Sequence, residues 1–562
     1  MKDNPLLVLS FVFFLILFIK CAIFIEYTSI GRATRFPRHI FREWKIYAMY
    51  IGICGTIVSF IFLFKWKWWI VIFSAILDIW LIGNLIYWRS FNDLLSVWCL
   101  DAAGNLSGFW TSIFMFLEWK DFVFPILTIL LVVVMICLPN KKQTKKLFFT
   151  ICLPLSVLFT IPQVNYVYKE LKLSLNPLHI KYAENWKPNR FHCYNFSPIT
   201  YFFLQVRTWA SVSAESKPQI NEQDVLPFLC KSNNENVRKD YNLVVVLFES
   251  LETWTIHSEI NNQPITPNLN KLCTSSHAFF ADKVMKQTRA GQSSDAQLII
   301  NTGLLPIYNG VTCNRYWYNS YFSIANSLQR YRKQTYVVDN GFCWNQFKLT
   351  SMYGYDSSLV NNKTDYLMCK RISENIPDKP YILQIVTLAS HVPFTAFADS
   401  SSLILPKNMP TDMANYIKSV NYTDKALGLL LDKVKNDSTI ILVTGDHTIF
   451  YSEQRDKFRK YCNEHNLDIP MEKEFIPLII YSPEIKNRVI VTDTVYQMDI
   501  YPTLLHLLHR ENYIWQGLGM NLLNPEAKRK ITPEAALKLS DAIIRNDYFQ
   551  KLHKTTPPTE YQ

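Results

Sequence analysis

The sequence predicts an α-helical transmembrane region of about five spans, followed by an α/β domain built on a mostly parallel sheet. Three observations support this fold class. Apolar runs of membrane-spanning length fill the first third of the chain. From Asn242 onward, short apolar strands alternate with amphipathic helices, which is the pattern of β-α-β units. Two of those strands end in acidic residues, and open α/β sheets bind their ligands at such strand ends.

The composition agrees with a chain that is part membrane protein and part soluble domain. Its 562 residues exceed one ordinary domain, and 15% of them are aromatic. The net charge of +12 is spread along the chain, which favours contact with a membrane surface and argues against a nucleic-acid partner. None of the twelve cysteines forms a C-x-x-C pair, so the sequence offers no zinc knuckle or redox motif. Those beyond residue 190 can pair as disulfides if that part lies outside the cytoplasm.

Residues 1–164 are expected to form the transmembrane domain. Each of five apolar runs is near the length needed to cross a bilayer: Leu6–Ile25, Ile46–Phe64, Trp68–Trp88, Phe122–Leu138 and Leu147–Val164. The segment Leu94–Glu118 is apolar but contains polar residues, so we interpret it as interfacial or re-entrant. The first run is too long for a signal-peptide core and no small-residue cleavage site follows, which indicates a retained anchor.

The basic loops give divided evidence on orientation. Asn140–Lys146 carries four lysines, which predicts a cytoplasmic loop and, with five spans, places everything after Val164 outside. The first loop, 29–45, contains five basic residues and would then also lie outside, against the same rule. The orientation is therefore taken from the chemistry of the second half of the chain.

The rest of the chain divides into three parts. Residues 165–241 contain several prolines and form an interfacial linker with amphipathic helices, including Pro198–Ser211. Residues 242–553 form the α/β domain, and 554–562 form a tail. The domain has five predicted strands: Leu243–Phe248, Thr335–Val338, Tyr381–Thr387, Ile440–Val443 and Phe475–Tyr481.

Two strand ends supply candidate metal ligands. The strand Ile440–Val443 is followed by a Thr-Gly turn and then by Asp446 and His447, an oxygen and a nitrogen ligand suited to Zn²⁺ or Mn²⁺. The alternative is a loop Asp-His pair that binds no metal. Glu249 follows the strand Leu243–Phe248; alone it is a typical solvated loop residue or helix cap, but beside Asp446 and His447 it becomes a third ligand.

Two further loops contain candidate catalytic side chains. Ser293, Ser294 and Asp295 precede a helix, where each can act as an ordinary N-cap. A hydroxyl at that position can also meet a bound phosphate, and a nearby metal would convert it into a nucleophile. His391 follows the strand Tyr381–Thr387; it is either structural or a group that binds phosphate or protonates a leaving oxygen. The Pro-started helix within Gln497–Leu505 is interpreted as packing.

The order of these motifs resembles the alkaline-phosphatase/sulfatase superfamily. Within it, the chain resembles the lipoteichoic acid synthase family of membrane phosphoglycerol transferases, most closely in Phe248–Glu252 and Ile265–Leu272. The motifs span roughly Asn242–Leu508, and the membrane part is similar in layout. The resemblance implies a sulfatase-like catalytic domain. The Cys/Ser-x-Pro-x-Arg signature of sulfatases is absent, so sulfate-ester hydrolysis is not expected.

The resemblance also implies the metal and the nucleophile. One divalent metal, manganese in the first place and zinc or magnesium as alternatives, is held by Glu249, Asp446, His447 and the nucleophile. The family's nucleophile is a Thr followed by Ser-Asp, and the register places Ser293 at that position, with Ser294 as the alternative.

The substrate pocket implied by the resemblance is only partly kept. Asp339, Trp344 and Asn345 match substrate-binding positions, and His391 is expected both to bind substrate and to act in catalysis. The chain has Val337 where the family has His and Gln346 where it has Arg. Gln cannot clamp a phosphate in bidentate fashion as Arg does.

The implied function is a membrane-bound, metal-dependent transferase. It would move a phosphoglycerol-type head group from a phospholipid to an acceptor hydroxyl through a covalent phospho-Ser intermediate. Alternatives are a phosphoethanolamine transferase acting on a lipid or glycan, a phosphodiesterase of the same superfamily, and a scaffold on a decayed catalytic fold. The donor would be phosphatidylglycerol or phosphatidylethanolamine and the acceptor an envelope glycan or glycolipid. The implied location is the bacterial cytoplasmic (inner) membrane, multi-pass, with the catalytic domain extracytoplasmic.

Overall fold

The computed structural model of the protein divides into two compact units. One unit comprises Met1–Val97 and Thr111–Ser216, and the other comprises Trp98–Trp110 and Lys217–Gln562. The structure describes residues 5–28, 44–62, 68–91, 94–96, 114–139, parts of 153–161, 193, 197–210, 217–230, 239–308, 310–339, 341, 345–360, 362–450, 452–471 and 474–555.

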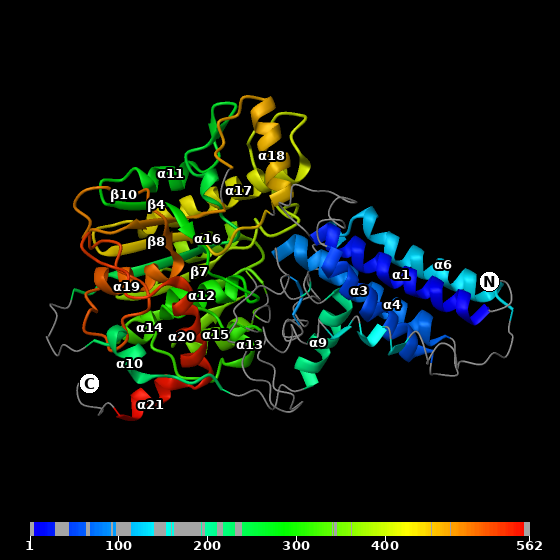
Figure 1. Ribbon diagram of the computed structural model, residues 1–562. Helices are drawn as coiled ribbons and strands as arrows, with labels where there is room; N and C mark the ends of the chain where they lie inside the picture. Colours follow the sequence, from blue (N-terminus) through cyan, green and yellow to red (C-terminus); the bar gives the residue numbers. More distant parts are fainter. Residues whose placement is uncertain are drawn as a thin grey trace. The chain divides into compact units, whose positions relative to one another are not determined.

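The first unit is helical (Figure 1). Its main helices are α1 (Pro5–Thr28), α3 (Trp44–Ile61), α4 (Trp69–Phe91), α6 (Val123–Cys137) with the preceding 3₁₀ turn η2 (Trp119–Phe122), and α9 (Pro198–Ala210). Among the described residues, three segments are long and apolar enough to cross a membrane, Pro5–Thr28, Trp69–Arg89 and Trp119–Cys137. They correspond to the first, third and fourth predicted spans.

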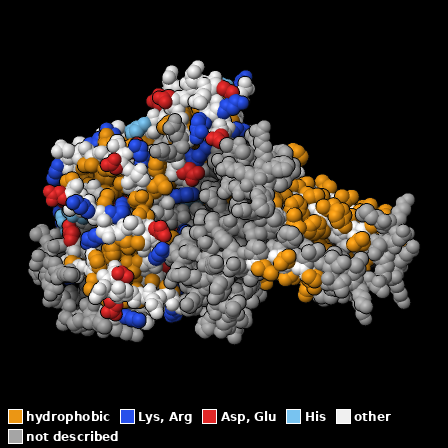
Figure 2. Space-filling model, in the orientation of Figure 1, with side chains coloured by type: hydrophobic (Ala, Val, Ile, Leu, Met, Phe, Trp, Pro, Cys, Tyr) orange, Lys and Arg blue, Asp and Glu red, His pale blue; other side chains and the backbone are white. Residues whose placement is uncertain are grey.

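The other two predicted spans are not confirmed. In the second, the apolar helix Tyr50–Ile61 is shorter than a full span. The fifth, Leu147–Val164, and the basic loops on which the orientation depends fall largely or wholly outside the described residues. On the face shown in Figure 2, hydrophobic side chains cover the described surface of the helical unit, whereas charged side chains are scattered over the α/β unit. Exposed apolar side chains such as Ile79 and Ile136 suit contact with lipid.

A buried polar cluster joins three of these helices. Lys20 on α1 has no exposed surface, and its ammonium pairs with Asp78 on α4. The same Nζ donates to Ser74 Oγ at 2.7 Å and to Thr128 Oγ1 on α6 at 2.6 Å. The structure buries Lys20 between helices. Buried charges of this kind need partners, so the cluster fixes how α1, α4 and α6 pack.

The second unit is built on a nine-stranded sheet in the order β10-β4-β9-β8-β1-β7-β5-β6, with β11 also pairing with β4 (Figure 1). The strands are β1 (Asn242–Phe248), β4 (Ala278–Met285), β5 (Arg332–Val337), β6 (Ser357–Leu359), β7 (Tyr381–Val386), β8 (Thr439–Gly445), β9 (Ile476–Tyr481), β10 (Val489–Val491) and β11 (Val495–Tyr496). A separate hairpin is formed by β2 (Glu259–Ile260) and β3 (Gln263–Pro264). Strands β1, β8 and β9 are buried along their whole length, which explains their continuous apolar sequences.

Helices cover both faces of the sheet (Figure 1). One group contains α11 (Pro267–Cys273), α16 (Asp365–Glu374), α17 (Thr411–Val434) and α18 (Ser452–Glu464). The other contains α12 (Ser293–Thr302), α13 (Thr312–Arg315), α14 (Ile324–Ser327), α15 (Gln346–Met352), α19 (Ile500–Leu507), α20 (Pro533–Arg545) and α21 (Tyr548–Thr555). The short α10 (Glu222–Val225) precedes the sheet, and brief 3₁₀ turns are η5 (Leu226–Phe228), η6 (Thr253–Thr255), η8 (Ala398–Ser400) and η9 (Gln497–Asp499).

All five predicted strands are present, and the mostly parallel sheet is confirmed. Strand β9 is the exception in direction, since it runs antiparallel to both β8 and β4. A wholly apolar strand carries no signal of its direction, so the sequence could not show this. The sequence reading also missed β4, whose apolar first half is followed by the polar pair Asp282-Lys283. The described cysteines beyond residue 190 are all free thiols, so the disulfide expectation finds no support among them.

Candidate functional site

The register of two central strands brings the predicted acidic ligands together. β1 and β8 are parallel neighbours, and Phe248 lies opposite Gly445. The next residues, Glu249 and Asp446, therefore leave the sheet side by side at its carboxyl edge. Gly445 is required there, because a Cβ atom would lie 2.2 Å from the carbonyl oxygen of Leu251.

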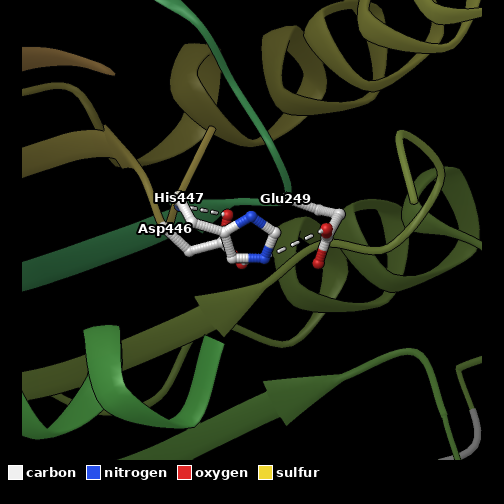
Figure 3. Close-up of side chains that lie close together, drawn as sticks. All are labelled: Glu249, Asp446 and His447. Atoms are coloured by element: carbon white, nitrogen blue, oxygen red, sulfur yellow. Dashed lines mark hydrogen bonds and ion pairs between the residues drawn. The ribbon is translucent and has the colours of Figure 1, made fainter. Parts of the chain in front are cut away.

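Glu249, Asp446 and His447 form a compact cluster of metal-ligand atoms (Figure 3). One ligand atom from each lies within 4.8 Å of the others, and all three residues are buried. His447 Nε2 is 3.7 Å from Glu249 Oε1 and 3.5 Å from Asp446 Oδ2. Figure 3 shows the imidazole turned toward the Glu249 carboxylate. The cluster offers two hard oxygens and one nitrogen around one point.

Neighbouring groups hold these side chains in place. Asp446 Oδ1 accepts the backbone N–H groups of Ser250 at 2.7 Å and of His447 at 2.8 Å. Ser250 Oγ donates to Glu249 Oε1 at 2.6 Å. The backbone N–H of Glu249 donates to Thr387 Oγ1, from the end of β7, at 2.9 Å. These contacts orient the carboxylates before any ligand arrives.

The donor atoms and protonation states of the cluster suit a divalent cation. Asp446 Oδ2 is buried and has no hydrogen-bond partner among the described residues, which leaves an acceptor oxygen directed at the cluster. Burial raises the pKa of Glu249 well above its ordinary range, and the Asp446 carboxylate raises it further. Burial also lowers the pKa of His447, which keeps its imidazole neutral. A cation would stabilise the ionised carboxylates, and neutral imidazole is the form that binds metals.

Ser293 is the hydroxyl that meets this cluster. It is the first residue of α12 and only 7% exposed, and its Oγ lies 3.4 Å from Glu249 Oε2. Ser294 Oγ instead donates to the carbonyl oxygen of Gly291 at 2.7 Å and stabilises its own turn. The preceding Gln292 has a φ of 42°, a strained backbone that is typical of functional turns. The geometry therefore favours Ser293 over Ser294 as the reactive hydroxyl.

Asp295 closes the loop that carries Ser293. Its Oδ2 accepts the backbone N–H groups of Arg289 and Gly291, both at 2.9 Å. Burial raises the pKa of Asp295 to about 7, against the effect of those two hydrogen bonds. Gly291 must lack a side chain, since a Cβ would lie 2.3 Å from Asp295 Oδ1 and 2.7 Å from Ser294 Oγ.

His391 lies on the loop after β7, the strand next to β1. Its Nδ1 is 2.8 Å from the carbonyl oxygen of Val392, which assigns the proton to Nδ1 and leaves Nε2 as the acceptor nitrogen. Burial lowers the pKa of His391, the Val392 carbonyl opposes this, and nearby His447 lowers the pKa further. His391 is thus close enough to the cluster to sense its charge, although it is not one of the three grouped ligands.

Of the predicted substrate residues, Asp339 is engaged within its own loop, Asn345 is hydrogen-bonded to α13, and Trp344 lies outside the described residues. Asp339 Oδ1 accepts the backbone N–H of Gly341 at 2.7 Å. Asn345 has a left-handed backbone and its amide donates to Asn314 Oδ1. Gln346, at the position of the family's Arg, is 3% exposed and its amide donates to Gln297 Oε1 at 3.1 Å.

Three supporting residues were missed by the sequence interpretation. Asp365 accepts the backbone N–H groups of Leu388 and Ala389, both at 2.9 Å, and so holds the His391 loop. Glu252 accepts the N–H of Ile449 at 3.0 Å, which ties down the loop after His447. Gln497, which we interpreted as packing, donates to the carbonyl oxygen of Asp446 at 2.8 Å. These contacts join distant parts of the chain, so sequence spacing does not predict them. The sequence showed only that these residues stand near helix starts or within the family's motifs.

Two family models and several known proteins match this chain. The lipoteichoic acid synthase N-terminal domain model matches residues 1–176, and the sulfatase model matches residues 241–510. The lipoteichoic acid synthase of Staphylococcus saprophyticus is 24% identical over 520 residues, covering 84% of this chain and 78% of that protein. Lipoteichoic acid synthase 1 of Bacillus subtilis is 22% identical, covering 79% of this chain and 74% of that protein.

The fold is similar to that of one solved membrane enzyme, and a second solved structure matches the chain less well. The integral membrane lipooligosaccharide phosphoethanolamine transferase A (EptA) of Neisseria meningitidis matches with a TM-score of 0.50 and 11% identity, covering 90% of this chain and 95% of that one. The lipoteichoic acid synthase LtaP of Listeria monocytogenes matches with a TM-score of 0.47 and 19% identity, covering 60% and 98%. The two domain models match in order along the chain, which therefore resembles the lipoteichoic acid synthases, and these similarities support a phosphotransferase of the sulfatase-like superfamily.

Proposed function

We propose that this protein transfers a phosphoglycerol head group from phosphatidylglycerol to an acceptor hydroxyl, through a covalent intermediate on Ser293. The observation that carries the proposal is the position of the Ser293 hydroxyl, 3.4 Å from Glu249 Oε2 at the edge of the buried Glu-Asp-His cluster. A hydroxyl beside such a cluster is the arrangement needed for nucleophilic attack on a phosphodiester. The lipoteichoic acid synthases similar to this chain make a lipid head-group donor the natural choice.

The residues that would hold the metal are Glu249, Asp446 and His447, with the Ser293 oxygen as a further ligand. When bound, a divalent cation would lower the pKa of the Ser293 hydroxyl and offset the charge of the phosphate oxygens. The mixed oxygen and nitrogen donors suit Mn²⁺ first, and Zn²⁺ or Mg²⁺ also match part of the set.

The first half of the reaction forms the intermediate. Ser293 Oγ loses its proton and attacks phosphorus, the bond from phosphorus to the diacylglycerol oxygen breaks, and diacylglycerol leaves after taking up a proton. In this proposal His391 exchanges that proton through Nε2, since its Nδ1 is directed at the carbonyl oxygen of Val392. Its lowered pKa keeps a substantial neutral fraction near neutral pH.

The second half regenerates the enzyme. An acceptor hydroxyl, deprotonated by the same His391, attacks phosphorus, and the bond between phosphorus and Ser293 Oγ breaks. Ser293 recovers its proton and the acceptor carries the head group. An envelope glycan or glycolipid supplies this hydroxyl in the proposal. The loop contacts from Asp365 and Asp295 keep both side chains in position through the two steps.

The apolar helices of the first unit anchor the enzyme at a membrane, and a lipid donor explains why an anchor is useful. We further propose that the α/β unit acts outside the cytoplasm of a bacterial cell, on the outer side of a multi-pass cytoplasmic membrane protein. A membrane-impermeant maleimide applied to intact cells would test this on a chain in which exposed Lys370 is replaced by cysteine. Labelling supports the orientation, and labelling only after cell lysis refutes it.

The test of the reaction is a transfer assay with the full chain in liposomes. The phosphatidylglycerol carries one fluorescent label in its acyl part and an isotope in its head group. We expect labelled diacylglycerol to be released, and digestion of the protein to yield a peptide containing Ser293 with the mass of glycerol phosphate. Ser293→Ala should lower the rate at least about 10³-fold, as removal of a nucleophile does.

Ser294→Ala is the matched control, because Ser294 carries the same hydroxyl but directs it at Gly291. Its rate should fall by less than about tenfold, the scale expected for loss of a single turn hydrogen bond. An adduct on Ser294, or full activity of Ser293→Ala, would refute the proposed mechanism. Phosphatidylethanolamine run in parallel decides between the two head groups, and isotope released to water instead of the acceptor would indicate a hydrolase.

A further inference from the structure

Three exposed aromatic side chains lie close together on the α/β unit. Tyr318 is 68% exposed, Phe347 46% and Trp317 37%. The rings of Trp317 and Tyr318 meet edge to face with their centres 6.1 Å apart, and the Lys348 ammonium lies 5.1 Å from the centre of the Trp317 ring. Arg315 lines the same hollow as Tyr318 and Lys348. We call this group the aromatic–basic patch: Arg315, Trp317, Tyr318, Phe347 and Lys348.

The patch lies at the surface because the opposite sides of its helices are committed to the core. The helix α15 buries Leu349 and Met352, which leaves Phe347 exposed and Lys348 half-buried at its edge. The short α13 is anchored in the same way by the buried Cys313. An aromatic ring on the outer side of an anchored helix adds nothing to the core, so a group of such rings marks a contact surface.

The charge of the patch indicates what it contacts. Among the described residues that line the hollow there are two cations, Arg315 and Lys348, and no carboxylate. Aromatic rings are enriched at the head-group level of a membrane, and Lys and Arg are attracted to anionic lipids. This attraction acts between net charges, so it requires no particular N–H group of either cation to be unoccupied. The patch therefore has the composition of a surface that faces an anionic bilayer.

The patch is attached to the helix that begins with the proposed nucleophile. Gln346 of α15 donates to Gln297 Oε1 at 3.1 Å, and Gln297 Nε2 donates to Gln346 Oε1 at 3.0 Å. Gln297 belongs to α12, whose first residue is Ser293. The same chain has apolar helices that are long enough to cross a membrane, so a bilayer is always near the α/β unit.

We propose that the aromatic–basic patch docks onto the anionic surface of the bilayer in which the chain is anchored. Trp317, Tyr318 and Phe347 enter the head-group region, while Arg315 and Lys348 face the lipid charges. Docking keeps the segment that carries Ser293 at the membrane surface, where a lipid reaches it without leaving the bilayer. The docking itself does not depend on the reaction proposed above.

The first experiment is photo-crosslinking of lipid to the full chain. The chain is reconstituted in vesicles of phosphatidylcholine with about 30% isotope-labelled phosphatidylserine, an anionic lipid that is not the proposed donor. Tyr318→benzoylphenylalanine should capture labelled lipid on irradiation. Tyr366→benzoylphenylalanine is the matched control, since Tyr366 is an exposed ring on α16, across the sheet from α15. It should capture at most about a tenth as much, because the attraction to lipid falls off within a Debye length of the surface.

Charge variants test the role of the patch directly. Lys348→Glu should lower lipid capture at position 318 about tenfold, and Lys348→Arg should retain it. Lys370→Glu on α16 is the control and should leave capture unchanged. Equal capture at positions 318 and 366, or capture that Lys348→Glu does not lower, would overturn the proposal. So would a crosslinked dimer in place of a lipid adduct, which would assign the patch to a second copy of the chain. If Lys348→Glu does not fold, high salt applied to the wild type carries the same test.

The second experiment separates docking from substrate binding. Phe347→Ser with Lys348→Glu should lower kcat/KM about tenfold for long-chain phosphatidylglycerol in vesicles, and less than about twofold for dihexanoyl phosphatidylglycerol dissolved as monomers. An equal fall for both donors would place these side chains in the substrate site and overturn the inference. A wild type that is inactive with both donors defeats the proposed function alone, because lipid capture at position 318 requires no turnover.

Discussion

Gly291→Ala offers a sharp test of how the nucleophile is positioned. An added Cβ would lie 2.3 Å from Asp295 Oδ1 and 2.7 Å from Ser294 Oγ. Ordinary contact begins at about 3.4 Å, so the loop or the carboxylate must move by about 1 Å. Asp295 cannot swing away without losing the backbone N–H groups of Arg289 and Gly291 that it accepts. The displacement is therefore passed to Ser293, two residues further along the chain.

A shift of about 1 Å at a reacting group lowers the rate about 100-fold. We expect kcat for diacylglycerol release to fall by about that factor in Gly291→Ala, while the chain still folds and inserts in membranes. The assay is initial rates in liposomes, with the unfolding temperature measured on the same preparation.

Gly83→Ala is the matched control, because a Cβ at Gly83 on α4 meets no atom of the described residues within 4 Å. Its activity should equal that of the wild type, and its helix should be slightly more stable because alanine is the better helix former. Wild-type kcat in Gly291→Ala, with unchanged stability, would refute the positioning argument.

Three further predictions concern groups away from the nucleophile. Lys20→Met leaves the Asp78 carboxylate buried without its ammonium partner and should lower stability by about 3 kcal/mol. The double variant Lys20→Met with Asp78→Leu should lose much less stability. Thermal unfolding in detergent checks this, and equal losses of stability in the two variants would contradict it. Burial raises the pKa of Asp424 to about 6 from an unfolded value of about 4, so the folded state holds the proton more tightly. Stability should therefore fall by about 3 kcal/mol as pH rises from about 4 to 6, and Asp424→Asn should flatten that dependence; identical pH profiles would count against it. Asp365→Asn replaces one carboxylate oxygen with an NH2 group, so one of the two backbone N–H groups of the His391 loop loses its acceptor; stability should fall by about 2 kcal/mol together with kcat. An unchanged kcat would separate that loop from catalysis.

Much of the candidate site could be predicted because strand ends carry a local signal. Glu249 and Asp446 each follow a continuous apolar strand, and parallel strands bring their carboxyl ends to one edge. The rule can be applied without knowing the strand order, provided that both strands lie in the centre of the sheet. His391 follows the same rule at the end of β7. Ser293 was harder, because three consecutive polar residues precede α12 and only the loop geometry separates the hydroxyls.

The remaining features depend on contacts that sequence spacing does not reveal. From the sequence, Gln346 indicated only that the family's Arg is missing at this position, whereas the structure shows Gln346 hydrogen-bonded to Gln297 in the core. Lys20 interrupts the first apolar run of the sequence, and its burial depends on Asp78 on another helix. The direction of β9 and the presence of β4 depend on sheet pairing between distant segments. The role of a residue could be predicted when it depends on neighbours along the chain. It could not be predicted when it depends on partners that are distant in the sequence.

The central claim is that Glu249, Asp446 and His447 hold one divalent cation beside the Ser293 hydroxyl. The most direct measurement is the metal content of the purified full chain, by mass spectrometry and, after manganese loading, by electron paramagnetic resonance. We predict about one equivalent per chain in the wild type and less than about a tenth of that in Asp446→Asn at unchanged fold, because each ligand of a closed set is needed for affinity. A wild type without tightly bound metal, or an Asp446→Asn variant that retains a full equivalent, would contradict the claim.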